Sequence, residues 1–71
     1  MPDRITFDSS VIAALTYDAS KNTLDVEFTS GRIYRYWMVP AAIYDAFIHA
    51  SSMGQYFNTE IRDRFPFREL E

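Results

Sequence analysis

The chain contains no cysteine, and its 71 residues include one histidine, two glycines and three prolines. Without cysteine there is no disulfide framework, no zinc ribbon and no thiol nucleophile, which fits a reducing compartment such as the cytoplasm. His49 has no second histidine at ligand spacing. Gly31 and Gly54 are too few for a phosphate-cradling loop. We therefore expect no metal and no cofactor.

Long apolar runs are also missing. No stretch approaches the roughly 20 apolar residues that span a bilayer, and no basic segment followed by an apolar one opens the chain. The sequence therefore predicts no membrane association and no secretory signal. The serines lack the Gly-x-Ser-x-Gly context of a nucleophile, and one histidine would have to serve alone as the base. We expect a protein that is not an enzyme.

Basic residues are scarce as well: the chain has seven basic and ten acidic residues, which gives a net charge of −3. The whole excess lies in residues 1–30, whereas residues 31–71 are neutral and hold five arginines. Nucleic-acid-binding domains are usually basic, so the balance counts against tight, nonspecific phosphate binding. A local basic patch in the second half of the chain stays open.

Three segments have the pattern of β-strands, namely 11–17, 23–29 and 32–38. The middle one is clearest, because apolar residues alternate with Asp25 and Glu27. Residues 1–8 are mostly polar and are expected to form an irregular lead-in to a single domain over residues 9–71. Each connection between these strands is short, which favours an antiparallel meander.

The turn between the second and third strands decides which side chains share a face. A two-residue turn would bury Arg35 on the apolar face, whereas a three-residue loop with Gly31 in a left-handed bulge places Tyr34 and Tyr36 there. Burying an unpaired charge costs more than changing the turn type. We therefore predict the bulged loop, with Val26 opposite Tyr34.

Helical spacing begins at Pro40, a residue suited to the first helical position. Ser52, with Gln55 three residues later, predicts the start of a second helix. A break at Asn58 is compatible with the pattern, and Pro66 ends the helix. The predicted fold is α+β: a three-stranded antiparallel β-meander followed by two helices packed on one face (β-β-β-α-α).

Several short motifs occur in order along residues 9–68: Tyr34-Arg35-Tyr36, Val39-Pro40, and Ser-x-Gly-x-Tyr-Phe-Asn over residues 52–58. The chain thereby resembles the KTSC domain, a small family named for its presence at the C-terminus of some lysyl-tRNA synthetases and also found as stand-alone bacterial proteins. The resemblance implies an association with RNA or tRNA, although no biochemical role is established for the family. Its signature residues, for which we expect structural roles, are Tyr34, Tyr36, Pro40, Ser52, Gly54 and Asn58.

Candidates for contact with nucleic acid are Arg32, Arg35, Trp37, Arg62 and Arg64, since arginine suits phosphate and stacks on aromatic rings. Each has a plainer interpretation. Arg35 is placed to form a cross-strand ion pair with Asp25 or Glu27. Arg62 and Arg64 alternate with acidic residues, so a solvated helix face with a Glu60–Arg64 pair also explains them.

The aromatic residues allow two interpretations too. Tyr34 and Tyr36 have the spacing of a base-stacking pair on a strand, but the predicted register favours packing under the helices. Trp37 is either exposed beside Arg35, as a recognition site, or packed beneath the N-terminal segment against Ile5 or Phe7.

Two functions from different classes follow. The first is a non-catalytic binding module that contacts RNA, which the resemblance favours. The second is a protein-interaction module, in one version a homodimer, that uses the open sheet face or an edge strand. The acidic net charge favours the second.

Overall fold

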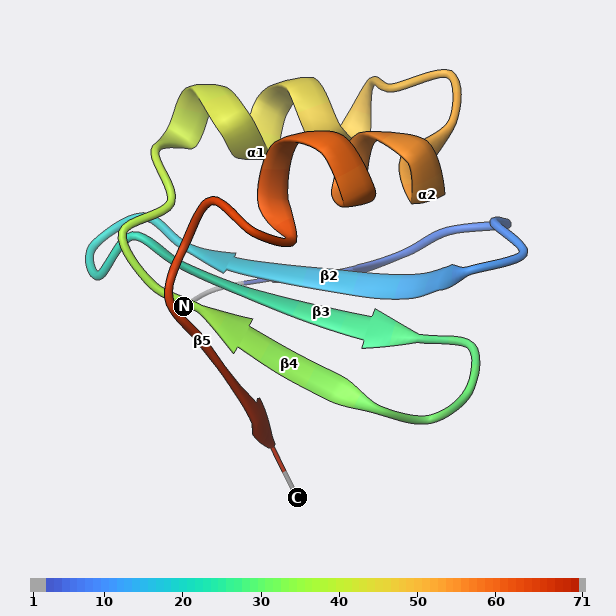
Figure 1. The fold of residues 1–71 in the computed structure, drawn as a ribbon, viewed down its shortest axis with the longest axis horizontal. Coiled ribbons are helices and arrows are strands. Elements are labelled where there is room, and N and C mark those ends of the chain that lie inside the picture. The colour runs from blue at the N-terminus through green and yellow to red at the C-terminus, as the bar shows by residue number, and fades with distance from the viewer. Residues whose placement is uncertain (1–2, 71) are drawn as a thin grey trace.

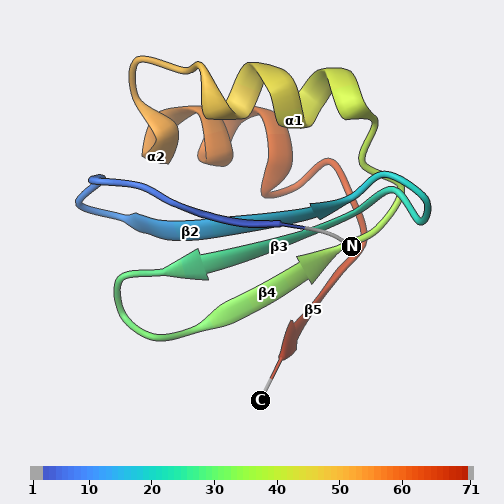
Figure 2. The same cartoon turned by 180° about the vertical axis from the view of Figure 1, so that it is seen from behind.

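The computed structural model describes residues 3–70 and consists of one antiparallel sheet with a helical layer on one face (Figures 1 and 2). The strands follow one another in the sheet in chain order, from β1 to β5. The other face of the sheet carries no helix. In chain order the elements are β1 (Arg4–Thr6), β2 (Ile12–Asp18), β3 (Thr23–Phe28), β4 (Ile33–Tyr36), α1 (Ala41–Ile48), α2 (Met53–Tyr56), the π-helical segment η1 (Phe57–Ile61) and β5 (Phe67–Leu70).

The β3–β4 hairpin has the predicted register. Val26 lies opposite Tyr34, and Leu24 lies opposite Tyr36. The loop has three residues and closes with Gly31 at φ +98°, a conformation that side chains with a Cβ rarely adopt. Both tyrosines therefore face the helices.

The prediction of three strands was incomplete, because the sheet has five. Residues 4–6, expected within the irregular lead-in, form β1 and pair with β2, with Ile5 opposite Leu15. Residues 67–70 return after the helices and pair with β4, with Phe67 opposite Tyr36. Both additions lie at the edges of the sheet, where they satisfy backbone groups that a three-stranded meander would leave open. Met1, Pro2 and Glu71, which the predicted ranges included, lie outside the described residues.

The helical layer starts nearly where the sequence predicts. Pro40 precedes the first residue of α1 as its N-cap, and the Ser52 Oγ accepts a hydrogen bond from the Gln55 backbone N–H at 3.3 Å, which caps α2. At Asn58 the helix does not break. It widens into the π-helical turn η1, in which the Thr59 hydroxyl donates to the Gln55 carbonyl at 3.0 Å.

The wide turn also removes the predicted pair between Glu60 and Arg64. Regular α-helical spacing ends with α2 at Tyr56, before Glu60 and Arg64, so these two residues no longer lie one above the other. The Arg64 Nε instead donates to the Thr59 carbonyl at 3.2 Å.

Nine buried apolar residues of the described chain form the core between the sheet and the helices, and aromatic rings from both layers fill it. Phe47 from α1 and Phe57 from η1 stack against each other with centroids 6.5 Å apart. Tyr36 meets Phe57 edge to face at 5.7 Å. The abundance of aromatic residues therefore mainly serves to fill the core of a very short chain.

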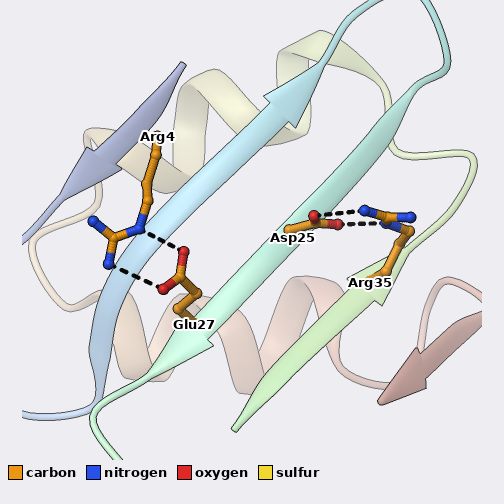
Figure 3. A network of polar contacts seen from close by, with 4 residues as sticks. All are labelled: Arg4, Asp25, Glu27 and Arg35. Carbon is orange, nitrogen blue, oxygen red and sulfur yellow. Dashed lines mark hydrogen bonds and ion pairs between the residues drawn. The ribbon is translucent and has the colours of Figure 1, made fainter. Parts of the chain in front are cut away.

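The open face of the sheet carries two forked ion pairs (Figure 3). Arg4 reaches across β2 to Glu27, with Nε 2.7 Å from Oε2. Arg35 pairs with Asp25 in the same way at 2.8 and 2.9 Å, which confirms the predicted cross-strand pair and raises the pKa of Arg35. Charges that satisfy each other in this way are not available to a ligand.

The two glycines give a matched stability test. In Gly31→Ala we expect the free energy of unfolding to fall by about 1–2 kcal/mol, because a Cβ strains a backbone with positive φ. In Gly54→Ala the new Cβ would meet the Val11 side chain at 3.4 Å in a helix, so we expect a change below about 1 kcal/mol. Urea unfolding followed by Trp37 fluorescence measures both. Equal losses in the two variants would contradict the assigned bulge.

Candidate functional site

A groove of about 480 Å³ opens where η1 faces β4, β5 and the end of β3. Its floor and walls are aromatic rings from all three strands and from the helical layer: Phe28, Tyr34, Tyr36, Phe57 and Phe67. Neighbouring rings contact each other at centroid distances of 5.1–5.7 Å. We call this site the aromatic groove. It presents flat apolar surfaces of the kind that stack planar ligands.

Polar side chains line the same groove. Arg32 directly precedes β4 and is two residues from Tyr34, which is two residues from Tyr36. Side chains two apart along a strand share a face, so all three lie on the side of the helices. Asn58 and Arg62 come from η1 and the residue that follows it. Arg32 has one loose partner, Glu69, at 4.0 Å, whereas Arg62 forms no ion pair with any residue between 3 and 70. The groove thus combines aromatic surfaces with cationic and amide donors.

The candidate residues predicted from the sequence do not form one site, because they lie on different sides of the sheet. Arg32 and Arg62 meet at the aromatic groove, but Arg35 and Trp37 lie on the other side of the sheet, in a shallow hollow with Asp25. Trp37 is 37% exposed there, so it does not pack beneath the N-terminal segment. Arg64 does not line the groove, and its Nε donates to the Thr59 carbonyl.

The signature residues also separate. Tyr34, Tyr36 and Asn58 line the aromatic groove. The other three lie in the helical layer: Pro40 and Ser52 are the N-caps of α1 and α2, and Gly54 is the α2 residue that lies next to the Val11 side chain. Part of the signature therefore coincides with the groove, and the rest positions the helices above it.

Sequence reasoning missed Phe67 as a site residue, because it missed β5. Phe67 is 53% exposed, and its ring lies 5.7 Å from Tyr34 and 5.3 Å from Tyr36. The signal available was indirect: Pro66 ends the helix, and the outer edge of β4 is open to a further strand.

Two classes of site find no support in the part of the chain described. Residues 3–70 contain no group of three or more histidine, cysteine, aspartate or glutamate side chains that would hold a metal ion. In the same residues, no helix has the length and apolar character needed to cross a membrane.

Comparison with known proteins decides the family. The family model described as the KTSC domain matches residues 8–65. The chain belongs to the KTSC domain family. A solved KTSC domain protein from Yersinia pestis has the same fold, with a TM-score of 0.93 and 29% identity over 100% of both chains.

Curated relatives of this KTSC domain include much longer proteins. It is 38% identical over 63 residues to a lysine–tRNA ligase from Nostoc punctiforme, a match that covers 89% of this chain and 11% of the ligase. It is 42% identical over 55 residues to an uncharacterized protein from Stutzerimonas stutzeri, with 78% of each covered. The chain thus spans about a tenth of the length of the ligase.

Proposed function

We propose that this KTSC domain is a non-catalytic module that binds a short single-stranded segment of RNA in the aromatic groove. The observation that carries the proposal is the meeting of Tyr34 and Phe67 with Arg32 and Arg62 in one groove. Aromatic faces stack unpaired bases, and arginines contact the phosphates between them. Several relatives are lysine–tRNA ligases, which are named for a tRNA, and this supports RNA as the ligand class.

The acidic net charge is compatible with such a site, because charge is unevenly distributed. The excess carboxylates lie in residues 1–30, and the charged side chains that line the groove are Arg32 and Arg62. Two cations support a weak, stacking-dominated contact with a few nucleotides rather than binding along a duplex.

The lining also supports a binding role over a catalytic one. Among the described residues, the groove is lined by hydroxyl, amide and guanidinium groups and by aromatic rings, without a carboxylate or an imidazole. General acid–base chemistry usually employs one of those two groups.

The open sheet face and the sheet edge support a protein-interaction role less well. Arg4 and Arg35 on the open face are already paired with Glu27 and Asp25. Symmetric pairing of two β5 edges would set Arg68 or Glu69 opposite its own copy, and like charges placed so are destabilising. If the two β5 strands paired with Phe67 at the centre, Pro66 would be part of the intermolecular strand pairing, and proline has no N–H to donate to it.

The test is a fluorescence anisotropy titration with end-labelled oligouridylate and with an RNA duplex of equal length. We expect binding of the single strand, weaker binding of the duplex, and a logarithmic salt slope near −1.4 for about two phosphate contacts. Trp37→Phe should bind equally well, since Trp37 lies across the sheet from the groove.

Three results would contradict the proposal: no binding of the single strand at low salt, equal binding of the duplex, or loss of binding in Trp37→Phe. Sedimentation of the protein alone provides the complementary measurement. A stable dimer without RNA binding would indicate the interaction module instead.

A further inference from the structure

Tyr36 is the buried member of three core tyrosines, with Tyr34 and Tyr44, whose hydroxyls make no hydrogen bond with any residue from 3 to 70. Tyr17 donates to the Val39 carbonyl at 2.7 Å, and Tyr56 donates to the Ile43 carbonyl at 3.3 Å. Tyr36 is 2% exposed, yet its hydroxyl makes no hydrogen bond with any residue from 3 to 70. Hydroxyl groups in protein interiors normally have a partner, so the described residues leave this one to pair with water or with a ligand.

The position of Tyr36 shows where that partner would come from. Its ring is held between Phe57, at 5.7 Å, and Phe67, at 5.3 Å, and it lines the aromatic groove. Within the described residues, no fully enclosed side-chain oxygen or nitrogen lacks a partner. The hydroxyl oxygen therefore keeps a small opening, and the groove is the cavity that reaches it.

The electrostatics favour an anion at this opening. Burial raises the pKa of Tyr36 to about 12, so the hydroxyl keeps its proton and can donate it at neutral pH. The positive charge of Arg62 is near enough to oppose that rise. Asp63, on the same turn, acts in the other sense, but it does not line the groove. A neutral donor and a guanidinium that has no ion pair among residues 3–70 thus line the same groove.

We propose that the Tyr36 hydroxyl and the Arg62 guanidinium form a phosphate subsite at the floor of the aromatic groove. This inference rests on the proposed function and specifies how the RNA lies in the site. An anionic oxygen accepts hydrogen bonds from both groups. The adjacent nucleoside then lies over Phe67, the half-exposed ring beside them. The phosphate is either a terminal group or one that links two nucleosides.

The test compares Tyr36→Phe with the matched control Tyr56→Phe, using oligouridylate with and without a 5′-phosphate. Tyr36→Phe removes only an unpartnered hydroxyl, so we expect an unchanged melting temperature and an affinity about ten-fold lower, from the loss of a hydrogen bond to a charged group. The control lies outside the groove and should bind as the wild type does.

Arg62→Gln and the double variant extend the test. If both groups hold the same phosphate, the double variant should lose less affinity than the product of the two single losses. A 5′-phosphate that strengthens wild-type binding but not binding by Tyr36→Phe would place a terminal phosphate in the subsite. If Tyr36→Phe loses the same affinity for oligouridylate with and without a 5′-phosphate, the subsite holds a phosphate that links two nucleosides.

The outcomes that overturn the two proposals differ. If the wild type binds RNA but Tyr36→Phe binds it equally well, the subsite is wrong while the proposed function stands. If the effects of Tyr36→Phe and Arg62→Gln simply multiply, the shared phosphate is excluded. If the wild type binds no RNA, both proposals fail.

Discussion

Replacing Arg32 and Arg62 together by glutamate should lower the affinity for single-stranded RNA at least about 100-fold. These two residues are the charged groups that line the aromatic groove. Loss of one hydrogen bond to a charged partner costs about 1.5–3 kcal/mol, and a tenfold change in affinity corresponds to about 1.4 kcal/mol. The new carboxylates would also repel the phosphates. Anisotropy titration at low salt measures the loss.

The matched control is Lys21→Glu with Arg68→Glu. It changes the net charge by the same amount, but neither residue lines the groove. Lys21 lies in the turn after β2, and Arg68 lies beside Arg35 across β4 and β5. We expect this variant to keep binding within a few-fold of the wild type. If both double variants lose affinity equally, RNA responds to overall charge and the groove is not the site.

The sequence predicts the hairpin that builds the groove floor, and the reason is local. Once Arg35 has to stay out of the core, the loop must have three residues with Gly31 in a left-handed conformation, and Tyr34 must face the helices. The observed register and the Asp25–Arg35 pair follow from that one constraint. Short-range chemistry is therefore enough for β3 and β4.

The two edge strands were missed because their pairing is decided by the rest of the sheet. Residues 4–7 do alternate in polarity, with Ile5 and Phe7 apolar, but the run is too short to identify a strand by itself. Residues 67–70 place two charged residues between Phe67 and Leu70, so they have no alternation at all. Their strand forms because the edge of β4 is open and Pro66 ends the helix nearby.

The candidate site could be predicted only in part. Arg32 and Arg62 were both candidates, but 30 positions separate them, and nothing local indicates that β4 and η1 bring them to the same groove. That the Tyr36 hydroxyl has no hydrogen-bond partner among residues 3–70 can be established only from the positions of all the polar groups around it. The widening of the helix at Asn58 had a weak signal, because the sequence pattern there was compatible with a break as well as with a continuous helix.

Phe47→Ala should leave the domain largely unfolded at 25 °C. Phe47 is the fully buried residue of α1, and its ring stacks on Tyr56 at 5.4 Å and on Phe57 at 6.5 Å. Truncating a buried phenylalanine costs about 3–5 kcal/mol, and a core of this size rarely supplies more than about 3–5 kcal/mol in total. Circular dichroism with thermal melting measures the loss of cooperative unfolding. A cooperative transition only a few degrees below that of the wild type would contradict it.

The matched truncation, Phe67→Ala, should separate folding from function. Phe67 is half exposed on the edge strand β5, so its removal leaves no enclosed cavity, and we expect the domain to stay folded. Its ring is nevertheless part of the groove floor, and stacking one base on an aromatic side chain is worth about 1–3 kcal/mol. RNA affinity should therefore fall about ten-fold in a folded protein. Retention of full affinity would mean that no base stacks on Phe67, and the ligand would then have to lie deeper, against Tyr34.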